Sequence, residues 1–249
     1  MSLLAFRQVS KRFLDGTREI AVLNRVSFEI EVGEKVGVLA SRRAGKTTLL
    51  KIAAGLMAPD EGEVLWDDLD LAGTGGDERA RARRDGGVAL ARGDWRVGRS
   101  TSVLQHVGMP LYSNGLNTVD AERHARRALE WVQASHLAHT DTAGLGLRER
   151  LKVELARAVV RRPRLLLMDE PAVLPQAEEA RAFYELLHSM PDRVGCALLV
   201  ASEDVSALRG LRPVMNLAGG RLHSTSSRRK VIDFPGSAVG GGPTGPGVS

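Results

Sequence analysis

The sequence predicts an α/β fold in which helices flank a mostly parallel β-sheet. In the C-terminal half, short apolar segments at 164–170 and 195–202 alternate with helical patterns at 148–160 and 177–189. In the N-terminal half, an apolar segment at 35–40 is followed by a loop containing Gly and Arg, and then by a helical pattern at 47–57. Parallel strands need such crossover helices, because a tight turn joins only antiparallel neighbours.

An antiparallel β subdomain is expected at the start of the chain. Residues 3–9 and 20–31 have the composition of strands separated by turns, and they precede the core strand at 35–40. The first helix should end near Gly55 and Pro59, and a further short strand is expected at 61–68.

An α-helical subdomain is expected at 92–150. A stretch rich in Gly, Asp and Arg at 71–87 predicts a loop with one short helix, and 87–91 predicts a buried strand. Residues 103–111 and 119–135 then show helical periodicity. The predicted core therefore comprises 1–91 and 151–234, and the tail at 235–249, with six glycines and three prolines, is expected to be flexible.

Composition argues against several classes of function. The net charge of +5 arises from 35 basic and 30 acidic residues, an excess that is modest and spread along the chain. With 4% aromatic residues there is little material for stacking on bases, so we expect no nucleic-acid partner. No apolar run approaches the roughly 18 residues of a membrane-spanning helix, which favours a cytoplasmic chain. The single cysteine, Cys196, is expected in the core.

The segment 40–48 has the pattern of a phosphate-binding loop between a strand and a helix. Backbone N–H groups at a helix N-terminus favour phosphate oxygens, a lysine can reach the β- and γ-phosphates, and a hydroxyl can bind Mg²⁺. The first glycine of the pattern is replaced by Ala40, which is expected to weaken binding, and the alternative is an inert turn. The predicted nucleotide-binding residues of the loop are Ser41, Arg42, Arg43, Ala44, Gly45, Lys46, Thr47 and Thr48.

The apolar segment 165–168 ends in two carboxylates, Asp169 and Glu170. Asp169 is predicted to hold Mg²⁺ together with Thr47, and Glu170 is the predicted catalytic residue that polarises or deprotonates the attacking water. A strand that ends in Asp-Glu by chance is the alternative, and the lysine loop earlier in the chain makes it the weaker one.

Together with the helical insert and the run Leu155-Ala156-Arg157-Ala158, these two motifs resemble the ATP-binding cassette (ABC) ATPase family. The resemblance covers about residues 3–224 and is greatest to cytoplasmic subunits of lipoprotein-release and macrolide-efflux exporters. It implies a P-loop NTPase (RecA-like) core that binds ATP and Mg²⁺, a membrane subunit as partner, and a second nucleotide-binding subunit. It also implies that Phe13 stacks on adenine, although a core Phe on a strand is the alternative.

Four positions depart from the family pattern. No Gln occurs from Asp85 to Val103, where the family has one after the strand at 87–91. The signature LSGGQ falls on Leu145-Gly146-Leu147-Arg148-Glu149, in which Glu149 would repel phosphate. The segment 172–176 lacks the expected Asp, and the switch histidine falls on Ser202. These departures predict a degenerate signature and an altered switch.

Three functions are compatible with this pattern. The leading hypothesis is a degenerate cassette that binds nucleotide, dimerises and couples to a membrane subunit with weak or no hydrolysis, peripheral on the inner face of the cell membrane. The second is an active ATPase that energises transport, which the presence of Glu170 favours. The third is a nucleotide-binding regulator outside transport.

Overall fold

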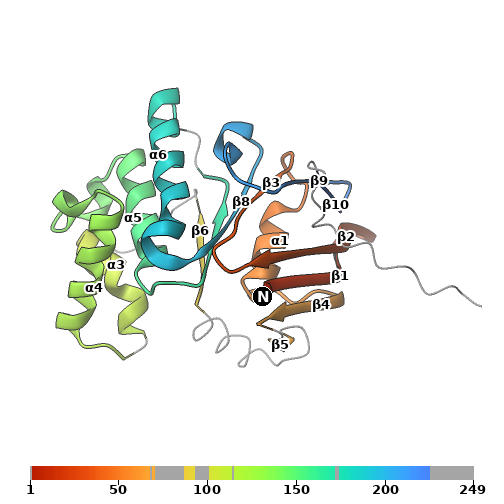
Figure 1. Cartoon of the computed structure of the whole chain (residues 1–249), viewed down its shortest axis with the longest axis horizontal. Coiled ribbons are helices and arrows are strands. Elements are labelled where there is room, and N and C mark those ends of the chain that lie inside the picture. Colours follow the sequence, from red (N-terminus) through yellow and green to blue (C-terminus); the bar gives the residue numbers. More distant parts are fainter. Residues whose placement is uncertain are drawn as a thin grey trace, which may run out of the picture.

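The computed structural model describes residues 2–67, 69–70, 87–92, 101–113, 115–171 and 174–224. In Figure 1, the strands formed by residues 2–31 and 61–66 lie at one end of the molecule, the helices of residues 103–159 lie at the other end, and strands of a second sheet lie between them. Predictions for 71–86 and for the tail fall outside the described residues.

The first sheet is the predicted antiparallel β subdomain. It comprises β1 (Ser2–Asp15), β2 (Arg18–Glu31), β4 (Glu61–Trp66) and β5 (Leu69–Asp70), in the order β2-β1-β4-β5. Phe6 and Phe28 are paired across β1 and β2, and their rings stack with centroids 4.6 Å apart. Residues 3–6 of β1 are all buried, as are Val26, Phe28 and Ile30 of β2, so this part of the hairpin is packed into the core.

The second sheet has the order β10-β9-β3-β8-β7-β6. Its strands are β3 (Lys35–Leu39), β6 (Val88–Arg92), β7 (Leu165–Asp169), β8 (Ala197–Ser202), β9 (Val214–Ala218) and β10 (Arg221–Ser224). All neighbouring pairs are parallel except β9 with β10, which confirms the predicted parallel sheet. The sequence interpretation missed β9 and β10.

Both faces of this sheet are covered, which explains its continuously apolar strands. In β7, Leu166 belongs to the core that faces the helical side, whereas Leu165 and Leu167 belong to the core shared with α1 and the β subdomain. Cys196 is buried at 1% exposure, as predicted.

The helices are α1 (Lys46–Ala53), α3 (Val103–Tyr112), α4 (Thr118–Trp131), α5 (Leu147–Val159) and α6 (Ala177–Met190), with short helical turns at Ser135–Leu137, Thr142–Gly144, Pro191–Gly195 and Val205–Leu208.

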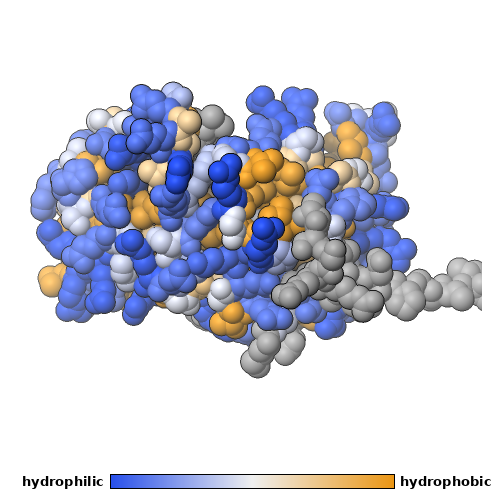
Figure 2. Space-filling view, turned by 45° about the horizontal axis from the view of Figure 1, so that its top comes forward, coloured by the Kyte–Doolittle hydropathy of each residue, from blue (hydrophilic) through white to orange (hydrophobic). Residues whose placement is uncertain are grey.

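Helices α3, α4 and α5 pack together as the helical side of the molecule (Figure 1). The predicted boundary at residue 150 falls within α5, which also packs against β6. Within the described ranges, no helix combines the length and apolar character needed to cross a bilayer. The face drawn in Figure 2 is mostly hydrophilic, with apolar residues gathered near its centre.

Candidate functional site

The sheet topology brings the predicted motifs to one edge. In the parallel register Leu39 pairs with Ser202, and Asp169 pairs with Ala201. The loop after β3, the carboxylates at the end of β7 and the residues after β8 therefore begin side by side, because parallel strands share a carboxyl edge.

The loop between β3 and α1 has two residues in the left-handed backbone region. Gly45 has φ 104° and Arg43 has φ 64°. A non-glycine residue in this region costs about 1–2 kcal/mol, so Arg43 stores strain in the loop. Gly45 is the N-cap of α1, and no side chain caps this end of the helix.

Replacing Gly45 by alanine is expected to lower the free energy of unfolding by about 2–4 kcal/mol. A Cβ at Gly45 would lie 2.9 Å from Val22 Cγ1 and 3.0 Å from the Val22 carbonyl oxygen, in addition to the unfavourable φ. Gly33→Ala is the matched control, because φ is +74° there but the space around it is open. Urea unfolding measures the free energy of unfolding of each variant. Equal decreases in Gly45→Ala and Gly33→Ala would contradict the packing argument.

A hollow of about 320 Å³ lies beside this loop. Phe13 on its wall is 39% exposed, so the alternative of a core Phe is wrong. The Lys11 ammonium lies 5.7 Å from the Phe13 ring centroid. The hollow thus joins an apolar, aromatic wall to the start of α1, and it is lined by Phe13, Ile20, Val22, Arg43, Gly45, Lys46, Thr47 and Thr48.

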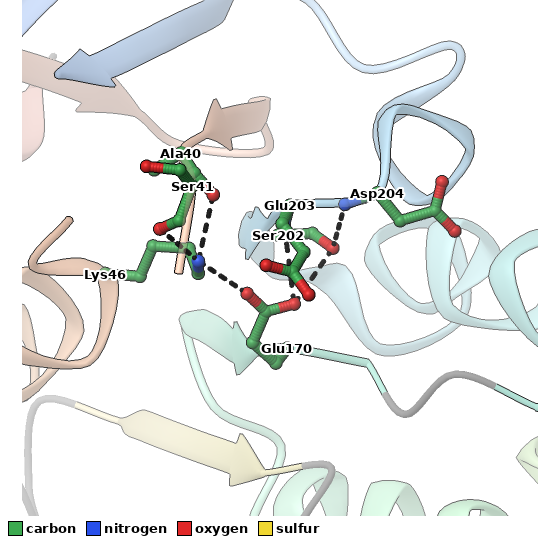
Figure 3. Close-up of polar contacts among 7 residues, drawn as sticks. All are labelled: Ala40, Ser41, Lys46, Glu170, Ser202, Glu203 and Asp204. Carbon is green, nitrogen blue, oxygen red and sulfur yellow. Dashed lines mark hydrogen bonds and ion pairs between the residues drawn. The ribbon is translucent and has the colours of Figure 1, made fainter. Parts of the chain in front are cut away.

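Lys46 and Glu170 form an ion pair at the centre of the site (Figure 3). Lys46 Nζ lies 2.7 Å from Glu170 Oε1 and donates to the carbonyl oxygens of Ala40 and Ser41, each at 2.9 Å. The Lys46 side chain is 6% exposed and that of Glu170 is 39% exposed. The ammonium is therefore desolvated and bound by three oxygens of its own chain.

The second carboxylate oxygen of Glu170 is held from β8 (Figure 3). Ser202 Oγ donates to Glu170 Oε2 at 3.2 Å, and the Glu203 N–H donates to the same oxygen at 3.4 Å. Ser202 is buried and accepts a hydrogen bond from the Asp204 N–H at 3.0 Å. The hydroxyl at the predicted switch position is thus directed at Glu170.

Tyr184 on α6 supports this loop. Its hydroxyl donates to Asp204 Oδ2 at 3.0 Å, and burial raises the pKa of Tyr184 to about 12. The Ser206 hydroxyl, which donates to Asp204 Oδ2 at 2.5 Å, holds the pKa of Asp204 below its usual range. Asp204 is therefore anionic at neutral pH and anchors the turn that follows Ser202.

Thr47 and Asp169, the predicted magnesium ligands, carry oxygen atoms of the kind that Mg²⁺ prefers. Thr47 lies in the first turn of α1, and Asp169 ends β7 with 6% exposure. Within the described residues, no cluster of three or more His, Cys, Asp or Glu side chains forms a metal cage. The donor set suits a cation that is also held by phosphate oxygens.

The segment at the signature position forms the start of α5. Gly146 is the N-cap, and its N–H donates to Glu149 Oε2 at 2.9 Å. Arg148 Nη1 lies 3.5 Å from Glu179 Oε1, and Leu147 is 44% exposed. A carboxylate of the chain itself therefore lies at the positive end of α5. Of the other two departures, residues 93–100 and 172–173 are outside the described ranges.

Sequence reasoning missed the contacts within the site. Lys46 and Glu170 were each predicted to act on a nucleotide or its water, so their mutual ion pair was not expected. Ser202 was interpreted only as a missing histidine, and Tyr184 was not singled out. The available signal was the topology: strands that are neighbours in a parallel sheet place the residues after them within contact distance.

Comparison with known proteins places this geometry in context. A model of the ABC transporter family matches residues 23–173. The chain is 30% identical to the lipoprotein-releasing system ATP-binding protein LolD of Shewanella denitrificans over 91% of this chain and 97% of that protein. It is also 30% identical to the methionine import ATP-binding protein MetN of Myxococcus xanthus, over 95% of this chain and 72% of that protein. The dimeric ABC transporter cassette MJ0796 superposes with a TM-score of 0.80 at 22% identity, covering 93% of this chain and 100% of the cassette.

Proposed function

Because the chain belongs to the ABC transporter family of ATP-binding proteins, we propose that it is a cassette subunit that binds ATP and hydrolyses it weakly or not at all. The observation that carries this proposal is the position of Ser202. Ser202 is 1% exposed and its hydroxyl donates to Glu170, so this side chain is too short and too buried to serve a γ-phosphate as an imidazole would.

Nucleotide binding rests on the loop and the hollow beside it. Phe13 would stack on the base, the start of α1 and Lys46 would hold the phosphates, and Thr47 with Asp169 would hold Mg²⁺. The bound cation would neutralise phosphate charge. Ser41, Arg42, Ala44 and Thr48 complete the proposed contact set, and Arg43 adds a cation at the wall of the hollow.

The signature position supports weak catalysis across a dimer. Glu149 accepts the Gly146 N–H, so its negative charge lies where a partner's phosphate would approach α5. Exposed Leu147 adds an apolar side chain at the same place. These side chains disfavour a nucleotide shared between two subunits.

We place the chain in the cytoplasm, peripheral on the inner face of the cell membrane. Its proposed partners are a transmembrane subunit and a second nucleotide-binding subunit. The LolD relatives favour a lipoprotein-release type of system, and no nucleic-acid partner is proposed. We also propose that residues 1–91 and 151–234 form the ATP-binding core and that residues 92–150 form the helical subdomain.

Two measurements on the purified chain test the proposal. Calorimetric titration with ATP and Mg²⁺ is expected to show one nucleotide per chain, while a phosphate-release assay shows turnover near background. Absence of binding would contradict the proposal, and rapid turnover that Glu170→Gln abolishes would favour an active ATPase instead. That alternative retains one supporting observation, the position of Glu170 beside Lys46.

A further inference from the structure

We propose that Glu170 is an internal counter-anion that occupies Lys46 until the phosphate of a nucleotide displaces it. This inference rests on the proposed nucleotide binding and gives Glu170 a function that does not require hydrolysis. The carboxylate would compete with the ligand for the same ammonium group.

The Lys46 ammonium has three N–H donors, and three oxygens of the chain lie around it. Two are the backbone carbonyls of Ala40 and Ser41, which the loop fixes in place, and the third is Glu170 Oε1 at 2.7 Å. A phosphate oxygen that reaches Lys46 must replace one of these acceptors. The carboxylate is the one that can leave, because it is at the end of a side chain.

The surroundings of Glu170 permit such an exchange. Its side chain is 39% exposed, whereas that of Lys46 is 6% exposed, so the carboxylate can turn toward solvent while the ammonium stays buried. Ser202 Oγ and the Glu203 N–H hold Glu170 Oε2 at 3.2 and 3.4 Å, which favours the paired state. A carboxylate and a phosphate bind an ammonium by the same charge-assisted hydrogen bond.

The competition has a measurable consequence. The apparent affinity for a nucleotide equals the intrinsic affinity multiplied by the fraction of molecules in which Lys46 is free of Glu170. Neutralising Glu170 should therefore strengthen binding and at the same time weaken the ligand-free fold. A residue that acts only as a base for hydrolysis would change neither quantity.

Binding of ADP tests this inference, because ADP presents phosphates to Lys46 and carries no γ-phosphate to hydrolyse. Calorimetry should show that Glu170→Gln binds ADP about tenfold more tightly than the unmodified chain. Ligand-free Glu170→Gln should melt about 2–4 °C lower. Ser202→Ala should strengthen ADP binding about two- to threefold, because Glu170 is held less firmly.

Glu203→Gln is the matched control, since it removes the same charge from the adjacent loop and leaves the backbone N–H in place; its ADP affinity should be unchanged. Light scattering on each sample measures whether the ADP-bound chain is monomeric, which separates a change in ADP affinity from a change in dimerisation. Unchanged or weaker ADP binding by Glu170→Gln, with normal binding by the unmodified chain, would overturn the inference alone. Failure of every variant to bind ADP would overturn the proposed function as well.

Discussion

Replacing Lys46 by methionine is expected to weaken ATP and ADP binding at least about 100-fold. The Lys46 side chain is buried in the site. Lys46 is the first residue of α1 and lines the hollow beside the loop. Methionine has similar length and no charge, so it fills the space without offering a donor. Calorimetric titration of the purified variant measures the loss.

The control for this variant is Lys51→Met in the last turn of the same helix, which should bind nucleotide as the unmodified chain does. Lys46→Met should also lower the free energy of unfolding by about 1–3 kcal/mol, because the carbonyls of Ala40 and Ser41 lose a charged donor. A folded Lys46→Met variant with unchanged nucleotide affinity would show that the loop is an inert turn.

Rebuilding the start of α5 is the second change with a large expected effect. The combined substitutions Gly146→Ser, Leu147→Gly, Arg148→Gly and Glu149→Gln remove the carboxylate from the helix N-terminus and the apolar side chain beside it. With ATP and Mg²⁺ present, we expect the rebuilt chain to self-associate at least about tenfold more tightly. Sedimentation velocity over a range of concentrations measures the dissociation constant of the dimer.

The same four substitutions combined with Lys46→Met form the control, because that chain should not hold nucleotide and should remain monomeric. Glu149→Gln alone should produce only part of the gain, since Leu147 remains exposed. Tight ATP-dependent dimers of the unmodified chain, unaffected by the rebuilding, would contradict the interpretation of this segment.

The sequence predicted strands and helices well wherever a single pattern of apolar residues continued along the whole element. The strands β3, β7 and β8 and the helices α5 and α6 were predicted close to their observed bounds, because both faces of the sheet are buried and the helices are amphipathic. Helix α1 was predicted over 47–57 but ends at Ala53. Strands β9 and β10 were missed because they mix polar with apolar residues and only alternate residues in them are buried, unlike β7, whose five residues are all buried. The two-glycine turn at 219–220 between them is a hairpin signal that the sequence interpretation did not use.

The sequence predicted which residues belong to the candidate site, but it did not predict the contacts among them. Motif spacing indicates which side chains face a ligand, whereas the partners of those side chains depend on the order of strands in the sheet. Ser202 and Glu170 are 32 positions apart and meet because β7 and β8 are neighbours. For Phe13, the exposure that decided between the two interpretations depends on how the β1-β2 hairpin packs.

The central claim is that this cassette holds nucleotide without efficient hydrolysis, and steady-state phosphate release tests it most directly. The purified chain and its Glu170→Gln variant are compared at saturating ATP and Mg²⁺, with binding confirmed on the same samples. We predict turnover well below about 1 per second for both, with no difference between them. Turnover typical of a working ATPase in the unmodified chain, abolished in Glu170→Gln, would contradict the account.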